Sequence, residues 1–292
     1  MKTPLRYAGG KSKAFRQITN LLPTDLKTIV SPFIGGGSLE SRWSSELNIK
    51  VIGYDAFQAL TTFYGALLER PDELANKLAD LSPDKQTYAK IKEELLSWSY
   101  TQDLLKDWKT GYYRRNPTEL DNLTAAAYFY FNHNLSYGPM YLGWISKIYQ
   151  DQKKWDKMVD NIRNYSNPNL SVSHLSFEKS IPSHRTEFLY LDPPYYESGD
   201  LFKPIYPNSN IPVLHQGFNH NHLAELLKNH KGKFLLSYND CEEVRELYKG
   251  FQFITPSWSY SMGNGETRSR TNVVKQSHEL LIHNYKQSIN YA

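Results

Sequence analysis

The chain has 292 residues, of which 40% are hydrophobic and 22% charged, as in a globular protein with a sizeable core. It holds no apolar run long enough to span a membrane and no signal peptide, so we expect an intracellular protein without a membrane partner. One cysteine, Cys241, excludes a disulfide framework and a cysteine-based zinc site, while a net charge of +4 permits a nucleic-acid partner.

Short apolar runs that alternate with amphipathic stretches predict an α/β fold with a doubly wound parallel sheet. The predicted strands of this sheet are 28–33, 50–55, 187–196 and 233–240. Helices are predicted at 38–47 and 221–229. Two further apolar runs, 251–260 and 278–285, predict strands joined by a polar loop, and they form an antiparallel addition at the C-terminal end.

The stretch from 60 to 147 interrupts this alternation, and we interpret it as an inserted, mainly helical domain. It begins with predicted helices at 60–69 and 84–96 and then becomes polar and aromatic. The aromatic residues suit either stacking on nucleic-acid bases or an aromatic core. A helix predicted at 152–164 is expected to return to the sheet domain, which would comprise 1–59 and 148–292.

Near the N-terminus, "LRYAGGKS" ends as a phosphate-binding P-loop does. That motif requires a glycine where Leu5 stands, and it follows a strand for which four preceding residues leave no room. The nucleotide hydrolase interpretation therefore fails. The glycine pair still indicates a tight turn at which the backbone can approach a ligand, with a plain surface loop as the alternative.

A second glycine-rich stretch, "PFIGGGSLE" at 32–40, lies between a predicted strand and a predicted helix. Three consecutive glycines let a ligand approach the carboxyl edge of the sheet. Glu40 stands where a dinucleotide fingerprint requires its third glycine, which favours a nucleoside-sized ligand without phosphate. Asp55 ends the next strand, where it would accept hydrogen bonds from ribose hydroxyls or cap a helix.

The most informative motif is "YLDPPYY" at 190–196. Its prolines fix φ and donate no N–H, so their carbonyls and the Asp192 carboxylate form a pocket of hydrogen-bond acceptors, with Tyr195 as a flat wall. Such a pocket suits a planar group that bears an NH2. The alternative is a Pro-Pro turn after a strand with a buried tyrosine.

Taken in order, these motifs resemble the Dam-like (D12 class) family of DNA adenine-N6 methyltransferases. The resemblance rests on Tyr7–Lys11, Phe33–Ser38, Asp55, an insertion, and Asp192–Tyr195, and it covers nearly the whole chain. Family members usually carry tryptophan where this chain has Tyr7. The resemblance implies a Rossmann-like methyltransferase sheet and identifies 60–147 as a target-recognition domain.

The resemblance further implies a site-specific enzyme that transfers a methyl group from S-adenosylmethionine to N6 of an adenine flipped out of DNA, leaving S-adenosylhomocysteine. The implied catalytic residues are Asp192, Pro193, Pro194 and Tyr195. The implied cofactor site comprises Tyr7, Lys11, Phe33, Gly35, Gly36, Gly37, Ser38, Asp55 and Asp192. We expect a monomer without metal that acts on double-stranded DNA at a short site, as in restriction-modification, in the cytoplasm or in the DNA-containing compartment of a viral host.

DNA contacts are expected from basic, amide and aromatic side chains of the insertion and of the late polar loop 263–275. They are Arg114, Arg115, Asn132, Asn134, Tyr137, Lys147, Arg268 and Arg270. For each of the charged residues, the alternative is a solvated surface charge.

The same residues also bear on other methyl-transfer chemistries. Cys241 lies between two acids, so the nucleophile of a cytosine-C5 methyltransferase is missing. Methylation of cytosine N4 uses the same amine chemistry, although Asp192 favours adenine because serine is usual there in N4 enzymes. RNA or protein amine methylation is a weaker alternative, and a catalytically inactive DNA-binding relative is another.

Overall fold

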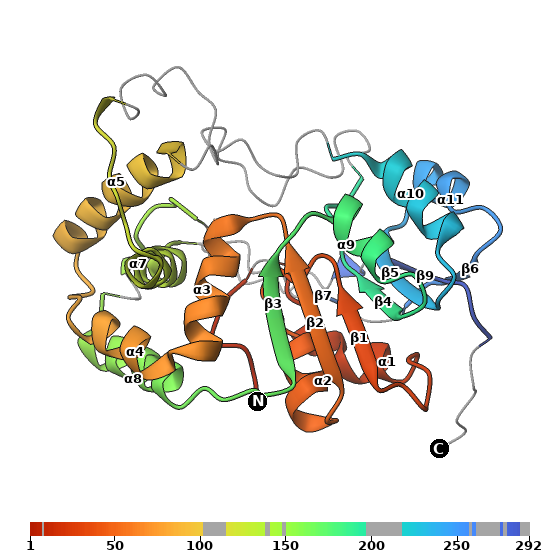
Figure 1. Ribbon diagram of the computed structural model, residues 1–292, viewed down its shortest axis with the longest axis horizontal. Coiled ribbons are helices and arrows are strands. Elements are labelled where there is room, and N and C mark those ends of the chain that lie inside the picture. The colour runs from red at the N-terminus through yellow and green to blue at the C-terminus, as the bar shows by residue number, and fades with distance from the viewer. Residues whose placement is uncertain are drawn as a thin grey trace.

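The computed structural model describes residues 1–7, 9–101, 115–137, 141–147, 150–196, 218–256, 259–260, 275–276 and 279–286. Within these ranges the fold is mixed α/β around a seven-stranded sheet (Figure 1). Its strands lie in the order β3 (Leu170–His174), β2 (Lys50–Asp55), β1 (Thr28–Ser31), β4 (Phe188–Leu191), β5 (Phe234–Asn239), β9 (Glu279–His283) and β6 (Gln252–Ile254).

The sheet is parallel from β3 to β5, and β9 runs antiparallel to both β5 and β6. This confirms the predicted Rossmann-like sheet with its antiparallel C-terminal addition. The chain places β2 and β3 on one side of β1 and places β4 and β5 on the other. The strand order therefore reverses between β1 and β4, and ligands of open α/β sheets bind beside the carboxyl ends of strands at such a point.

Two strands differ from the prediction. The predicted strand 251–260 is divided into β6 and the short β7 (Ser259–Tyr260), which pairs with β8 (Lys275–Gln276) in a separate two-stranded sheet. Pro256 lies between β6 and β7, and a proline donates no hydrogen bond to a sheet. The edge strand β3 was not predicted because its sequence, LSVSH, is half polar and mostly exposed.

Helices occupy the predicted ranges 38–47, 60–69, 84–96, 152–164 and 221–229, and several others were not predicted. The helical elements are η1 (Ser12–Ala14), α1 (Phe15–Thr19), α2 (Glu40–Glu46), α3 (Gln58–Glu69), α4 (Pro71–Ala79), α5 (Lys85–Thr101), α7 (Asn122–Leu135), α8 (Gln152–Arg163), α9 (Phe177–Ser183), α10 (His220–Asn229) and α11 (Glu242–Leu247). No helix in the described ranges is long and apolar enough to cross a membrane.

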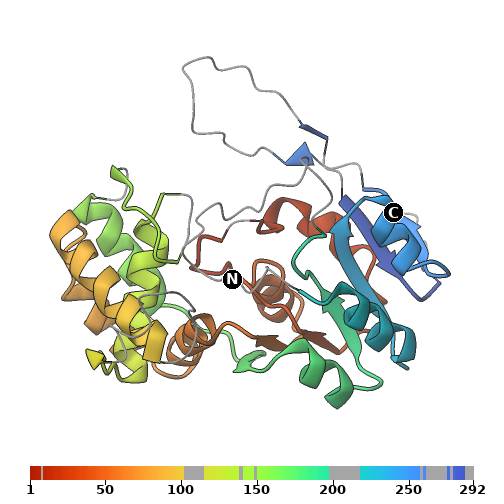
Figure 2. The same cartoon turned by 90° about the horizontal axis from the view of Figure 1, so that it is seen from above.

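Helices α4, α5, α7 and α8 form a group on one side of the molecule, and α3 lies between this group and β3 (Figures 1 and 2). Helix α8 belongs to the group because the Trp155 ring meets Phe131 at 5.0 Å and its Nε1 donates to the Leu78 carbonyl at 3.2 Å. Helix α8 thus packs against the helical group, and its assignment to the sheet domain stays a prediction. The proposed domain division at 60–147 stays a prediction.

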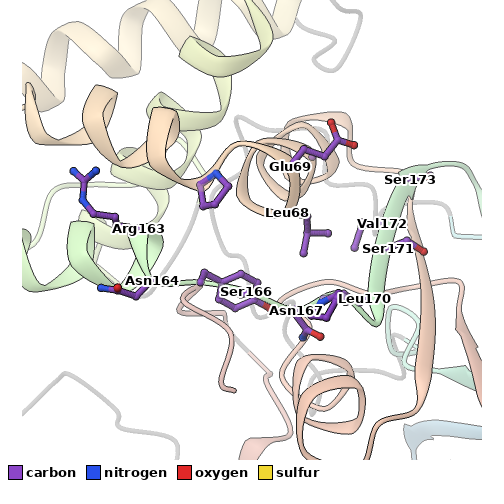
Figure 3. A pocket seen from close by; sticks show the side chains of 14 residues that line it. Leu68, Glu69, Arg163, Asn164, Ser166, Asn167, Leu170, Ser171, Val172 and Ser173 are labelled. Carbon is purple, nitrogen blue, oxygen red and sulfur yellow. The ribbon is translucent and has the colours of Figure 1, made fainter.

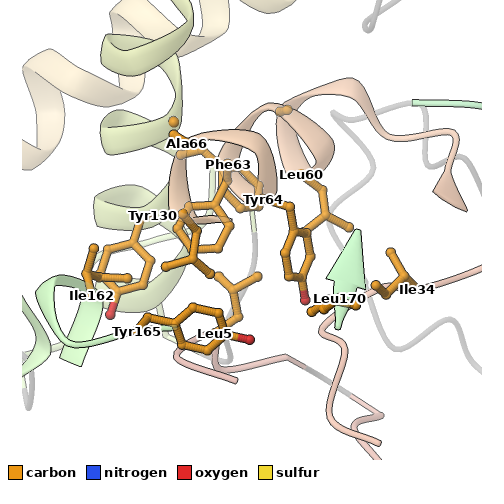
Figure 4. Packing of buried hydrophobic residues seen from close by; sticks show 14 of the residues in the cluster. Leu5, Ile34, Leu60, Phe63, Tyr64, Ala66, Tyr130, Ile162, Tyr165 and Leu170 are labelled. Atoms are coloured by element: carbon orange, nitrogen blue, oxygen red, sulfur yellow. The ribbon is translucent and has the colours of Figure 1, made fainter. Parts of the chain in front are cut away.

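Aromatic rings fill the interior between α3, α7 and α8 (Figure 4). Phe63 of α3 stacks on Tyr130 of α7 at 5.3 Å, and Tyr165 lies in the same cluster, as does Leu5 from the N-terminal segment. Each such side chain contributes about 1.5–3 kcal/mol by burial. Of the two interpretations of the aromatic insertion, the aromatic core holds for these residues.

Candidate active site

The glycine-rich stretch and the Asp192 motif meet at the point where the strand order reverses. Strands β1 and β4 are parallel neighbours, with Ile29 opposite Phe188 and Val30 opposite Leu189. Gly35–Gly37 follow the end of β1, and Asp192 directly follows β4. Two motifs that lie more than 150 residues apart in the sequence are thus brought to one edge of the sheet.

The N-terminal stretch lies against this glycine loop. Gly35 and Gly37 have φ values of +47° and +59°, which disfavour a side chain. At Gly36 the restriction is space, because a Cβ there would lie 2.3 Å from Tyr7 Cβ. The backbone N–H of Lys11 donates to Ser38 Oγ at 3.0 Å. Tyr7 therefore lies against Gly35 and Gly36, and Lys11 is hydrogen-bonded to Ser38 at the end of the same loop.

Asp55 fixes the glycine loop from the end of β2. Its Oδ2 accepts from the Gly35 N–H at 3.0 Å, and its Oδ1 accepts from the Phe57 N–H at 2.9 Å. Burial raises the pKa of the Asp55 carboxyl, and these two backbone N–H groups act in the opposite direction. Asp55 thus holds the loop that a ligand would approach, whether or not it also contacts that ligand.

Phe33, the last predicted cofactor-binding residue, stands between β1 and the glycine loop. Its half-buried ring lies 5.5 Å from the Phe177 ring and 5.7 Å from the Phe218 ring. These three rings form an apolar wall beside the strand ends.

Lys11 links the N-terminal stretch to the Asp192 motif. Its Nζ lies 3.1 Å from Asp192 Oδ1 and donates to the Tyr195 hydroxyl at 2.8 Å. The same Nζ lies 2.6 Å from Oε1 of Glu279, the first residue of β9. Tyr195 donates its own hydroxyl proton to Glu279 at 2.7 Å. The Lys11 ammonium therefore contacts two carboxylates, those of Asp192 and Glu279, and the phenol of Tyr195.

The two carboxylates of this network differ in acidity. Burial raises the pKa of Asp192 to about 6, with Lys11 acting against this shift and Glu279 adding to it. Burial would also raise the pKa of Glu279, but Lys11, Ser237 and Tyr195 outweigh it and hold that pKa at about 2. Glu279 is thus a fixed negative charge, whereas Asp192 can take up a proton near neutral pH.

Sequence reasoning missed two residues of this site, Glu279 and Asn239. Asn239, at the end of β5, is fully buried. Its side-chain amide accepts a hydrogen bond from the Tyr196 N–H at 2.8 Å and donates one to the Tyr196 carbonyl at 3.0 Å. It thereby holds the segment that carries Asp192–Tyr195. The sequence offered one signal for each: Asn239 is a polar residue at the end of a largely apolar strand, and Glu279 is an acid at the start of another.

The predicted DNA-binding residues fall into three groups. Arg114, Arg268 and Arg270 lie outside the described residues. Arg115, Tyr137 and Lys147 are exposed on the helical side of the molecule, where their role stays a prediction. Asn132 and Asn134 are fully buried, which contradicts their proposed role in contacting DNA.

Both asparagines bind backbone groups instead. Asn132 Oδ1 accepts from the Leu142 N–H at 2.6 Å, where Leu142 takes a positive φ. Asn134 Oδ1 accepts from the Arg6 N–H at 3.0 Å. Buried amides in a helix surrounded by apolar residues must find partners in the fold, and here they hold loops.

A cavity lies elsewhere, beside the edge strand β3 (Figure 3). Its volume is about 660 Å³, and it is lined by α3, the start of α4 and the segment from Arg163 to Ser173. None of the predicted site residues lines it. Among the described residues, no group of three or more His, Cys, Asp or Glu side chains is arranged to hold a metal ion.

Comparison with known proteins adds a family to this geometry. The sequence profile of the D12 class N6 adenine-specific DNA methyltransferases matches residues 7–262. The type II methyltransferase M.MjaIII of Methanocaldococcus jannaschii is 25% identical, over 98% of this chain and 99% of that protein. M.CviBI, a type II methyltransferase of Paramecium bursaria Chlorella virus NC1A, is 22% identical over 86% and 88%. The modification methylase StsI of Streptococcus sanguinis is 23% identical over 98% of this chain, which spans only 43% of that protein.

Proposed function

The chain belongs to the D12 class N6 adenine-specific DNA methyltransferases, and from this premise we propose that it transfers a methyl group from S-adenosylmethionine to N6 of a flipped adenine at a specific DNA site. One observation carries the proposal: the glycine loop and Asp192 follow the ends of β1 and β4, the neighbouring strands between which the strand order reverses. Homology assigns a DNA methyltransferase, and this geometry supports the donor and the target atom.

The absence of a side chain at Gly36 lets Tyr7 pack directly against the glycine loop, and an adenosine-based donor would lie against the surface that this loop and the Tyr7 ring form together. S-adenosylmethionine, when bound, supplies an electrophilic methyl group on a sulfonium sulfur. We assign its binding to the nine residues Tyr7, Lys11, Phe33, Gly35, Gly36, Gly37, Ser38, Asp55 and Asp192. Phe33 and Tyr7 offer apolar ring surface, and Asp55 offers acceptors for ribose hydroxyls.

Asp192 and Pro193 supply the acceptors for the amine. The lone pair of adenine N6 is delocalised into the ring, so the amine is a poor nucleophile. Hydrogen bonds from its two N–H groups to the Asp192 carboxylate and the Pro193 carbonyl would orient N6 and raise its electron density. As N6 gains the methyl group it must lose one proton, and an Asp192 carboxyl with a pKa of about 6 suits that proton.

Tyr195 would stack on the extruded base and offset part of the unstacking cost, which is a few kcal/mol. Its hydroxyl is held by Lys11 and Glu279, and its ring lies 6.1 Å from that of Tyr238 in a stacked arrangement. The ring plane is therefore set before any base arrives.

The DNA itself would be read from the helical side of the molecule. Arg115, Tyr137 and Lys147 are exposed there, and α7 ends beside Tyr7, since the His133 ring stacks on the Tyr7 ring at 5.6 Å. Contacts made by residues 60–147 would thus lie next to the methyl-transfer site. We assign this segment as the target-recognition domain.

The test is transfer of tritium from methyl-labelled S-adenosylmethionine to double-stranded DNA. Wild type should label DNA, and Asp192→Asn should lower the rate by about 10²–10³ because one strong acceptor is lost. Asp240→Asn is the matched control, since Asp240 also follows a strand end but pairs with Arg245 at the surface. DNA binding without any labelling would instead indicate a catalytically inactive relative.

A further inference from the structure

Glu279 is a buried acid that belongs to none of the sequence motifs. It begins β9, the antiparallel strand, and only 2% of the residue is exposed. Its Oε1 receives three donors: Lys11 Nζ, the Tyr195 hydroxyl and Ser237 Oγ. A buried carboxylate with this many donors keeps its negative charge.

Glu279 and Asp192 compete for one cation. Lys11 Nζ lies 2.6 Å from the Glu279 carboxylate and 3.1 Å from the Asp192 carboxylate. Lys11 is itself 3% exposed, whereas the Asp192 side chain is 27% exposed. Of the three charged groups, therefore, Asp192 offers by far the most side-chain surface to a ligand, and the shorter contact of Lys11 is with Glu279.

Other ionisable groups surround Asp192 without changing this balance. Glu40 of α2, Tyr190 of β4 and Tyr195 all act on Asp192 or are acted on by it. Burial raises the pKa of Glu40 to about 7, and burial raises the pKa values of both tyrosines. None of the three supplies a positive charge near neutral pH, so the division of the Lys11 charge decides how strongly Asp192 accepts.

We propose that Glu279 is a positioning residue of the methyl-transfer site, which draws the Lys11 ammonium away from Asp192 and so leaves the Asp192 carboxylate available to the adenine amine. The inference rests on the proposed function, since it assigns Asp192 its acceptor role. Without Glu279, Lys11 would pair with Asp192 alone. A carboxylate neutralised by an adjacent ammonium accepts a hydrogen bond or a proton from the substrate less readily.

The test compares Glu279→Gln with Glu279→Asp and wild type. Glu279→Gln keeps the shape of the side chain and leaves one buried cation facing one carboxylate, so the fold should persist. The rate of methyl transfer at pH 7.5 should fall about tenfold. The midpoint of the acidic limb of its pH–rate profile should also shift to a lower pH by about one unit, because Lys11 then stabilises the charged form of Asp192. Glu279→Asp keeps the charge and should keep the limb near its wild-type position.

The matched control is Glu46→Gln, which removes one carboxylate from a surface ion pair with Arg42 and should leave both rate and limb unchanged. A lower rate with an unmoved limb in Glu279→Gln would mean that Glu279 is merely structural, and it would overturn the inference. So would an equal downward shift in Glu279→Asp.

A second measurement separates this inference from the proposed function. In ¹³C NMR of protein labelled at aspartate Cγ, the Asp192 signal is the one missing from Asp192→Asn, and its titration midpoint needs no substrate. The midpoint should fall in Glu279→Gln. It should return to the wild-type value or above in Lys11→Met/Glu279→Gln, which removes cation and competitor together. A shifted midpoint in a protein that methylates nothing would refute the function but uphold the charge competition. Methylation with an unshifted midpoint would refute the competition alone.

Discussion

Replacing Gly36 with alanine perturbs the closest approach in the candidate cofactor site. The new Cβ would lie 2.3 Å from Tyr7 Cβ and 2.8 Å from Tyr7 Cγ. Non-bonded carbon atoms prefer about 3.5–4.0 Å, so one of the two segments must move by roughly 1 Å. Because Tyr7 Cβ is attached directly to the backbone, rotation of the side chain cannot relieve the contact. Overpacking of this kind costs about 1–3 kcal/mol, which should lower Tm by roughly 2–10 °C.

The assay pairs thermal unfolding with isothermal titration of S-adenosylmethionine. Displacing Tyr7 also displaces the turn that carries Lys11, so we expect at least a tenfold loss of affinity in Gly36→Ala, or about 1.4 kcal/mol. Gly65→Ala is the control, since a Cβ at this position of α3 meets nothing within 4 Å. It should leave affinity unchanged and stabilise the helix by up to about 1 kcal/mol. Equal Tm and equal affinity in the two variants would refute the packing of Tyr7 on the loop.

Three further outcomes follow from the site and its surroundings. Since burial raises the pKa of Asp192 to about 6, protonation removes an acceptor as the pH drops, and kcat/KM of wild type should fall below pH 6; a flat profile between pH 5 and 8 would contradict this. Asn239→Ala leaves two backbone groups of Tyr196 unpaired and should lower the free energy of unfolding in urea by about 1–3 kcal/mol. It should also lower the rate of methyl transfer, and an unchanged rate would contradict the role of Asn239 in holding the Asp192 segment. Lys147→Ala should weaken DNA binding equally for all sequences and reduce the salt slope by about 1 in fluorescence anisotropy; altered sequence preference would exclude a phosphate contact.

The strands that carry the site could be predicted because each contains a short run of apolar residues. The strand predicted at 50–55 coincides with β2, and β4 and β5 are buried at every residue. Fully buried parallel strands leave an uninterrupted apolar run in the sequence. The carboxyl ends of such runs are where the glycine loop, Asp55 and Asp192 stand, so the chemistry could be located before any contact was known.

The other site residues depend on contacts that no local pattern records. Glu279 looks like an ordinary charge before a strand until the pairing of β9 with β5 places it beside Ser237 and Lys11. Asn132 and Asn134 were misinterpreted for the same reason, since polar residues in an aromatic helix suit either an interface or a buried loop contact. Only the packing around α7 decides between these two roles.

The central claim is that the methyl group is transferred to N6 of adenine. The most direct measurement is mass spectrometry of nucleosides from unmethylated double-stranded DNA after incubation with the protein and S-adenosylmethionine. The proposed function predicts N6-methyladenine as the methylated nucleoside, at a level that Asp192→Asn reduces about a hundredfold or more. N4-methylcytosine in its place, or N6-methyladenine at an undiminished level in Asp192→Asn, would contradict it.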